Sequence, residues 1–118
     1  VRARAAVSGG QLLAMSGASA VVTSGLARFI TTDLEVDATG SGLNVCGLAV
    51  NNAGSAAYVG MITRGVVILT AGGTVTGGFK QEAINSIGVQ DGTSGIKLIG
   101  RALTTTTSGA FALIDLNI

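Results

Sequence analysis

Apolar residues in this chain recur in short strand-like runs and not at helical spacing. Residues 33–37 (DLEVD) alternate acidic and apolar side chains, which is the period of a strand with one exposed face. Residues 66–69 (VVIL) form an aliphatic block between turn signals, as expected of a buried strand. Residues 96–99 (IKLI) and 111–116 (FALIDL) fit the same description. The pattern therefore predicts short strands, of which the last three are buried.

Glycines separate these runs every few residues and supply the positive-φ turns that short strands need. The chain has 19 glycines and no proline. Residues 79–85 (FKQEAIN) are helix-compatible in composition, but they are too few for more than a turn or two. We expect one all-β domain over residues 1–118, a compact small barrel or β-clip-like domain of short strands. The glycines expected to shape its turns are Gly25, Gly42, Gly47, Gly78, Gly95 and Gly100.

A shift of 53 residues brings two parts of the chain into register. Residues 22–50 then match residues 75–103 at 8 of 29 ungapped positions, where about three matches are expected by chance. A chain rich in Gly, Val and Thr also resembles itself without any duplication. The identities fall on turn glycines and on alternating apolar positions, however, which favours a duplication. The candidate repeat units are residues 22–62 and 75–117.

Composition makes the expected domain apolar and almost uncharged. The residues are 47% hydrophobic, the mean hydropathy is +0.62, and seven basic against six acidic side chains give a net charge of +1. Nucleic-acid binding needs a clustered basic excess, which this chain lacks. No apolar run reaches the roughly 20 residues of a membrane-spanning helix. A monomer with so little charge should aggregate, so we expect oligomerisation or docking on another surface.

The chemistry available to the side chains is narrow. The chain has no histidine and one cysteine, Cys46, which excludes Ser-His-Asp catalysis, Cys-His catalysis and zinc sites built from Cys and His. We expect no enzymatic activity and no cofactor. Cys46 lies in the apolar run LNVCGLAV and is expected to be a small buried hydrophobe, which favours folding in a reducing compartment.

Three carboxylates are the one candidate metal site. Asp33, Glu35 and Asp37 would share one face of a strand and could bind Ca²⁺ weakly. The simpler interpretation is a solvated strand face whose apolar residues point inward. We favour the solvated face and expect no metal.

Residues 73–82 (GTVTGGFKQE) resemble a phosphate-binding loop only in their glycines. A P-loop places Lys directly after its last Gly and then Ser or Thr, whereas here Phe79 precedes Lys80 and Gln follows. No long helix is expected after the loop to present its N-terminus to a phosphate. We interpret the stretch as the opening turn of a second β unit, matching VVTSGLAR 53 residues earlier.

The first residues are expected to form an arm. Arg2 and Arg4 precede a long uncharged stretch, but Ser, Gly and Gln interrupt it, so a signal peptide is not expected. We assign residues 1–8 to an N-terminal arm, unstructured by default.

The chain resembles the small β-rich capsid decoration, or cement, proteins of tailed viruses. That family shows glycine turns followed by a G-hydrophobic-A-hydrophobic strand, a small-residue linker and a closing apolar strand. The pattern covers most of residues 10–116, although residues 80–90 are less strand-like than it requires. The stretches that carry it are VVTSGLARF, CGLAVNNAGSAAYVGMI, RGVVILTAGGTVTGGF and IGRALTTTTSGAFALIDL.

The resemblance implies a structural virion protein, made in the host cytoplasm and located on the outer surface of an icosahedral capsid. There it would cement neighbouring major capsid protein subunits against the internal pressure of the genome. It implies homo-oligomers, with a trimer favoured, and neither nucleic-acid nor membrane partners. We expect the arm to contact the capsid as an added strand, and its deletion to weaken decoration without unfolding the domain. The arm residues concerned are Val1, Arg2, Ala3, Arg4, Ala5, Ala6 and Val7.

Other functions remain open at this stage. Another structural role, such as a head-fibre base, a tail component or a subunit of a non-viral shell, follows from the same features. A non-catalytic β binding module attached to an enzyme would need a polar pocket, for which the sequence offers few residues. A nucleic-acid-binding barrel is disfavoured by the neutral charge and the four aromatic residues.

Overall fold

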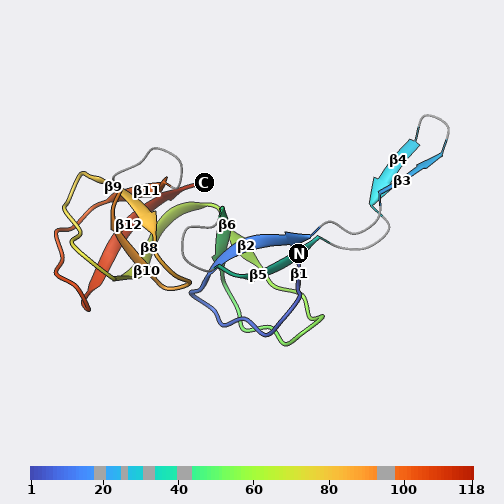
Figure 1. Ribbon diagram of the computed structural model, residues 1–118, viewed down its shortest axis with the longest axis horizontal. Coiled ribbons are helices and arrows are strands. Elements are labelled where there is room, and N and C mark those ends of the chain that lie inside the picture. The colour runs from blue at the N-terminus through green and yellow to red at the C-terminus, as the bar shows by residue number, and fades with distance from the viewer. Residues whose placement is uncertain (18–20, 25–26, 31–33, 40–43, 93–97) are drawn as a thin grey trace.

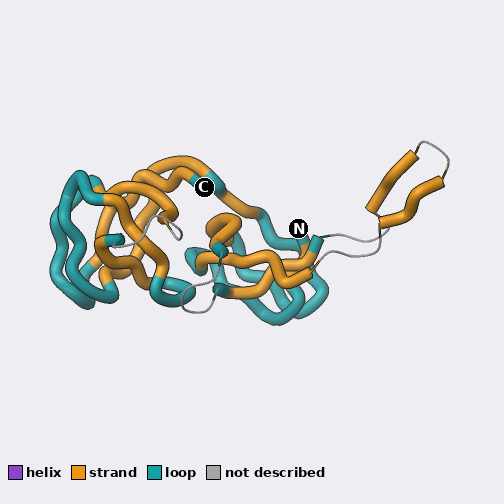
Figure 2. Tube along the Cα trace, turned by 45° about the horizontal axis from the view of Figure 1, so that its top comes forward, coloured by secondary structure: helices purple, strands orange, loops and turns teal. Residues whose placement is uncertain are grey.

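A computed structural model shows a chain of strands and connecting turns, with no helix among the described residues (Figures 1 and 2). The described residues are 1–17, 21–24, 27–30, 34–39, 44–92 and 98–118. The expected all-β class is confirmed. The strands are β1 (Arg2–Ala3), β2 (Leu12–Gly17), β3 (Val21–Ser24), β4 (Ala27–Ile30), β5 (Glu35–Ala38), β6 (Val45–Ala49), β7 (Met61–Ile62), β8 (Arg64–Ala71), β9 (Lys80–Ala83), β10 (Gly88–Asp91), β11 (Leu98–Ala102) and β12 (Phe111–Asn117).

The strands form two lobes along an elongated body, with the β3–β4 hairpin extending beyond one end (Figure 1). The Cα atoms span 53 × 29 × 22 Å. Residues 64–118, which we call lobe 2, form a closed barrel in the order β10-β8-β12-β11-β9. Its longest contact is the antiparallel pair β8–β12, which runs from Arg64 opposite Asn117 to Thr70 opposite Phe111.

Residues 1–62, which we call lobe 1, form a five-stranded sheet in the order β1-β5-β2-β6-β7. An isolated bridge between Arg2 and Tyr58 joins the edge strand β1 to the segment that precedes β7. The sheet therefore curls round on itself, and β1 has neighbours on both sides.

Lobe 1 and lobe 2 repeat the same strand pairings. Each lobe has one parallel pair, β1 with β5 in lobe 1 and β8 with β10 in lobe 2. The second strand of each pair carries a fully buried valine, Val36 in β5 and Val89 in β10. The β2–β6 and β11–β9 pairs both shift register after Leu13 and Gln81 respectively. Three backbone hydrogen bonds of lobe 1 also recur in lobe 2. The bond from Gly10 N–H to the Ala49 carbonyl corresponds to that from Gly78 to Ala102 (both 2.7 Å), and the bond from Ala49 to Gln11 (2.8 Å) corresponds to that from Ala102 to Phe79 (2.9 Å). The bond from Ala3 to Ala57 corresponds to that from Ala71 to Ala110 (both 2.8 Å).

The correspondence between lobes differs from the one expected for residues 22–25. Val7, which bridges to Ala53, is the counterpart of Val75, which bridges to Thr106, at a distance of 68 residues. From β5 onward the distance is 53 residues, as Val36 and Val89 show. Lobe 1 therefore contains 15 additional residues between β2 and β5, and Val22 lies there in the β3–β4 hairpin instead of opposite Val75. The duplication itself stays a prediction, with a first unit that begins before residue 22.

Two further expectations need correction. Residues 79–85 hold the strand β9 and not a helical turn, because this segment pairs on one side with β10 and on the other with β11. The strands predicted to be buried, residues 66–69 and 111–116, are buried on one face only, so that their side chains alternate between the barrel interior and the surface. In the third, residues 96–99, the first two lie outside the described residues and the last two belong to β11.

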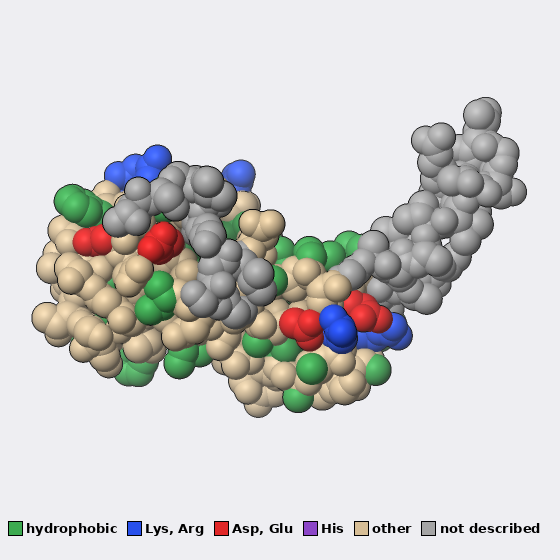
Figure 3. All heavy atoms as spheres, viewed as in Figure 1, with side chains coloured by type: hydrophobic (Ala, Val, Ile, Leu, Met, Phe, Trp, Pro, Cys, Tyr) green, Lys and Arg blue, Asp and Glu red, His purple; other side chains and the backbone are tan. Residues whose placement is uncertain are grey.

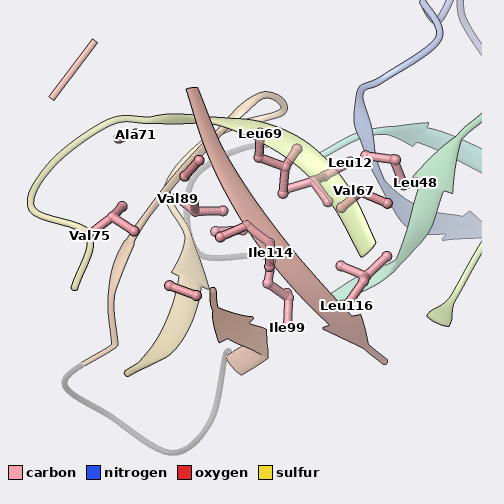
Figure 4. Packing of buried hydrophobic residues seen from close by; sticks show 13 residues of the cluster. Leu12, Leu48, Val67, Leu69, Ala71, Val75, Val89, Ile99, Ile114 and Leu116 are labelled. Carbon is pink, nitrogen blue, oxygen red and sulfur yellow. The ribbon is translucent and has the colours of Figure 1, made fainter. Parts of the chain in front are cut away.

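The barrel interior is continuous with part of lobe 1. Leu12 and Leu48, which pair across β2 and β6, pack into the aliphatic cluster of lobe 2 (Figure 4). A 2.6 Å hydrogen bond from the Leu12 N–H to the Ser86 carbonyl crosses the same junction. Lobe 1 keeps a second cluster of its own, which includes Leu13 and Val36.

The glycines expected in turns have different roles. Gly78 does lie in a turn, with φ +87°, and Gly10 occupies the equivalent turn with φ +89°. Gly47 and Gly100 instead lie inside β6 and β11. A Cβ atom at Gly100 would collide with the backbone of Asp115, so that position has no room for a larger residue. A Cβ atom at Gly47 would collide with the side chain of Met61, which would have to move. Gly25, Gly42 and Gly95 lie outside the described residues.

Candidate interaction surface

The outer face of lobe 2 exposes five large apolar side chains. Alternation along β8 and β12 turns one set of residues into the barrel and the other outward. Ile68 and Leu113 lie opposite each other in the two strands, and the Leu103 N–H donates to the Leu113 carbonyl (2.9 Å), so the three form one row. We call the β8–β12 face the surface made by Val66 (61% exposed), Ile68 (62%), Leu103 (50%), Phe111 (76%) and Leu113 (38%).

Charged residues of both signs border this face. Lys80 lies opposite Arg101, and Arg101 lies opposite Asp115, in a row across β9, β11 and β12. Asp115 in turn lies opposite Val66, so the row continues into the β8–β12 face. These three charged side chains line a shallow groove, together with Leu98, Gly100 and Asn117.

A second shallow groove lies on the face itself, where Ile68, Phe111 and Leu113 line it together with Thr104–Thr106. Its hydroxyl groups are engaged with the chain itself: the Leu113 N–H donates to Thr104 Oγ1 (3.2 Å), and Thr106 Oγ1 donates to the Phe111 carbonyl (3.4 Å). The groove therefore presents methyl groups and Phe111 more than free polar atoms.

The N-terminal residues do not form a separate arm. Ala3 is fully buried and Val7 is 4% exposed. The backbone of β1 pairs with β5 on one side and donates to the Ala57 carbonyl on the other, so it has no free edge for a neighbouring sheet. Contact with a capsid through these residues stays a prediction, but not as an added strand. The Arg4 side chain is 62% exposed.

The acidic strand face is paired with arginines of the N-terminal segment. Arg2 Nη2 lies 3.1 Å from Glu35 Oε1, and Arg4 Nη1 lies 3.6 Å from Asp37 Oδ2. Figure 3 shows basic and acidic side chains side by side on lobe 1. Asp33 lies outside the described residues, within which no group of three possible metal ligands occurs.

A polar network stands inside lobe 2, where sequence patterns gave no signal for it. Gln81 is fully buried, and its Nε2 donates to the Phe79 carbonyl (3.2 Å) and to Asp91 Oδ1 (2.8 Å). Asp91 also accepts the Thr76 N–H at Oδ1 (2.8 Å) and the Thr76 hydroxyl at Oδ2 (2.7 Å). Gln81 Oε1 is buried and finds no hydrogen-bond partner among the described residues.

The charge of Asp91 is favoured by this network. Desolvation raises the pKa of its carboxyl group, but the hydrogen bonds from the Thr76 N–H, the Gln81 amide and the Thr76 hydroxyl outweigh it, and the pKa lies below its usual value. The carboxylate therefore holds the turn at residues 76–78 to β10 and β9, and its role is structural.

Cys46 is only half-buried, although the sequence predicted a buried residue. Its Sγ lies 3.7 Å from Met61 Sδ, and burial raises the pKa of the thiol above its usual value, with a smaller opposite effect from a backbone hydrogen bond. A raised pKa leaves less reactive thiolate at neutral pH.

The N–H groups of the glycine turn in residues 73–82 are directed into the lobe. Gly77 donates to Thr105 Oγ1 (3.0 Å), Gly78 to the Ala102 carbonyl (2.7 Å) and Phe79 to the Thr76 carbonyl (3.0 Å). These donors hold the turn against β11 and the residues that follow it, and they do not converge on a ligand position.

Within the described part of the chain, no helix is long and apolar enough to cross a membrane.

Comparison with known proteins gives one structural match. The sequence matches no family model and no curated protein. The fold is similar to a solved structure of the head fibre gp8.5 N base of bacteriophage phi29, with a TM-score of 0.67 and 15% sequence identity. The match covers 99% of this chain and 90% of the phage chain. At this identity the likeness establishes a shared fold.

Proposed function

We propose that this chain is a structural protein of a phage head, attached to the outer surface of the icosahedral shell through the major capsid protein. The observation that carries the proposal is the likeness to the phi29 head fibre base, which spans almost the whole of both chains. A similarity of this extent includes both lobes.

The surface chemistry supports a role in lasting contacts. A barrel face of five large apolar side chains suits a permanent interface, because such interfaces are more apolar than ordinary protein surface. The polar side chains of the lobe 2 network, Asp91, Gln81 and Thr76, form hydrogen bonds with one another and hold a turn in place.

At a finer level two roles on the shell are distinguished by what the bound chain does. As a fibre base it would anchor a projecting part of the virion. As a cement protein it would contact neighbouring capsid subunits and strengthen the shell against genome pressure. We propose attachment of the fibre-base kind, accompanied by a cementing effect.

The test uses phage heads that lack this protein. Purified chain is mixed with the heads, bound chain is measured by co-sedimentation, and its position is read from electron microscopy of the particles. We expect saturable binding on the outer surface and a higher temperature of head disruption. Binding without a higher temperature of head disruption would support the fibre-base role and contradict the cementing effect. Failure to bind shells at all would contradict the proposal.

The same assay tests the N-terminal residues. Arg4→Glu changes an exposed side chain and breaks its ion pair with Asp37, without altering the buried Ala3 and Val7. Arg64→Glu makes the same change of charge at an exposed position of β8 and serves as the control. If the N-terminal residues contact the capsid, Arg4→Glu lowers binding and Arg64→Glu does not.

A further inference from the structure

The strands β8 and β12 have the composition of strands that are covered on both faces. Residues 66–69 and 111–114 are apolar without interruption, a pattern typical of buried strands. Within one chain only the inward set is buried: Val67, Leu69, Ala112 and Ile114 are at most 9% exposed, whereas their neighbours on the β8–β12 face are 38–76% exposed. The outward set is therefore placed for burial against something outside the chain.

The equivalent surface of lobe 1 differs at the centre of this patch. Leu103 donates its N–H to the Leu113 carbonyl, and its counterpart Val50 donates to the carbonyl of Gly60 (3.0 Å). A glycine thus stands in lobe 1 where lobe 2 has the central leucine of the apolar row. Val50 (52% exposed) and Tyr58 (67%) stand at the positions equivalent to Leu103 and Phe111, so the central leucine, and not the whole face, distinguishes lobe 2.

The border of the face favours a copy of this chain as the occupant. Lys80, Arg101 and Asp115 bring both signs of charge to one edge, and the whole chain carries a net charge of +1. A surface that binds its own copy must not repel itself, and a mixed rim around an uncharged centre satisfies this condition. A copy is also present from the moment the chain folds, whereas a separate partner must be met later.

We propose that the β8–β12 face is the surface on which a second copy of this chain docks. The apolar row Ile68–Leu113–Leu103 forms the centre of the interface, and Phe111 and Val66 extend it along the strands. Lys80, Arg101 and Asp115 form its rim. This self-association needs no capsid, so its test is independent of the role on the phage head.

The test is sedimentation-velocity ultracentrifugation of the purified full chain over a range of concentrations. Ile68→Lys and Leu113→Lys place a charge in the centre of the face at positions that are already open to solvent in one chain. Val50→Lys is the matched control, because Val50 is 52% exposed and occupies the equivalent position to Leu103 in lobe 1. Circular dichroism checks that each variant is folded.

We expect the unaltered chain and Val50→Lys to sediment as oligomers, and the two face variants to associate at least about tenfold more weakly. A second readout is the alkylation rate of Ile68→Cys in a Cys46→Ser background, which should fall as the protein is concentrated. A monomeric unaltered chain, or an oligomer unchanged by Ile68→Lys, would overturn the proposal. If the unaltered chain is monomeric and Ile68→Lys loses binding to phage heads, the capsid is the occupant instead.

Discussion

Individual side chains distinguish two lobes that share one pattern of pairing. In lobe 1 the position next to the register shift is Leu13, opposite Ala38, and both belong to an apolar environment. In lobe 2 the same positions hold Gln81 and Asp91, which bind each other and the turn at Thr76. The corresponding turn of lobe 1 is held by Gln11, whose Oε1 accepts the Ser8 N–H (2.8 Å). One fold thus uses two different acceptors to satisfy the same backbone donor.

The Asp91 network makes lobe 2 sensitive to acid. The pKa of Asp91 is lower in the folded chain than in the unfolded chain, so its contribution to stability is complete above about pH 4 and is lost as the pH falls through the folded-state pKa. We expect Asp91→Asn to lower the free energy of unfolding by about 1–2 kcal/mol at neutral pH. The difference from the unaltered chain should narrow below about pH 4.

Urea unfolding at a series of pH values measures this effect. Thr76→Val keeps the carboxylate and removes one of its donors, so it should show a smaller loss with the same dependence on pH. A loss for Asp91→Asn that is constant from neutral to strongly acidic pH would show that the charge of Asp91 does not matter.

At the scale of elements, the sequence predicted strands that overlap β5, β8, β11 and β12, but not which of their faces are covered. The alternation of residues 33–37 was enough to place β5, because one face is acidic and the other apolar. β8 and β12 carry apolar residues on both faces. The sequence pattern of such a strand does not depend on whether its second face is covered by the same chain or by another molecule. The sequence pattern therefore could not predict that one apolar face of these strands is exposed.

Long-range pairing explains the other differences. The segment 79–85 has helical composition, but its place between β10 and β11 makes it a strand. The shift of 53 residues found the correspondence of Val36 with Val89 and of Gly47 with Gly100, because no insertion separates these segments. The same shift could not align Val7 with Val75, because the β3–β4 hairpin is inserted between Val7 and β5 and changes the distance between the two valines to 68 residues.

The β3–β4 hairpin should be dispensable for the fold, unlike the N-terminal residues. Lobe 2 joins β9 to β10 through residues 84–87 alone, so a short connection between β2 and β5 is compatible with this pairing. We expect replacement of residues 20–31 by a short Gly-Ser linker to change the melting temperature by only a few degrees. Deletion of residues 1–7 removes the buried Ala3 and Val7 and should unfold lobe 1.

Thermal unfolding followed by circular dichroism compares the two deletions. The earlier expectation, that loss of the N-terminal residues leaves the domain folded, would be restored if that variant melted like the unaltered chain. Collapse of the hairpin variant would show that β3 and β4 support lobe 1.

At the scale of the whole molecule, the two lobes share part of one apolar core. Leu12 and Leu48 come from lobe 1 and pack with the residues inside the lobe 2 barrel (Figure 4). Leu13 instead packs within lobe 1. All three side chains are at most 6% exposed. Neighbouring residues of β2 thus point into different lobes, as alternation along a strand requires.

This sharing predicts that the lobes unfold together. Leu12→Ala and Leu13→Ala should each cost about 2–5 kcal/mol, and each should lower the hydrogen-exchange protection of both lobes. Mass-spectrometric hydrogen exchange under mildly denaturing conditions gives the protection of each lobe separately. If Leu13→Ala loosened lobe 1 and left lobe 2 unchanged, the lobes would be independent units.

The shared core also has a mechanical consequence. Two barrels joined by a flexible linker would rotate freely about each other, and an attachment at one barrel would leave the other undirected. Here Leu12 and Leu48 lie within the second barrel, and the Leu12–Ser86 hydrogen bond crosses the junction, so bending at that point would open a packed core. The two lobes therefore form one stiff body, in which a tilt imposed on one lobe is passed on to the other with little loss of angle.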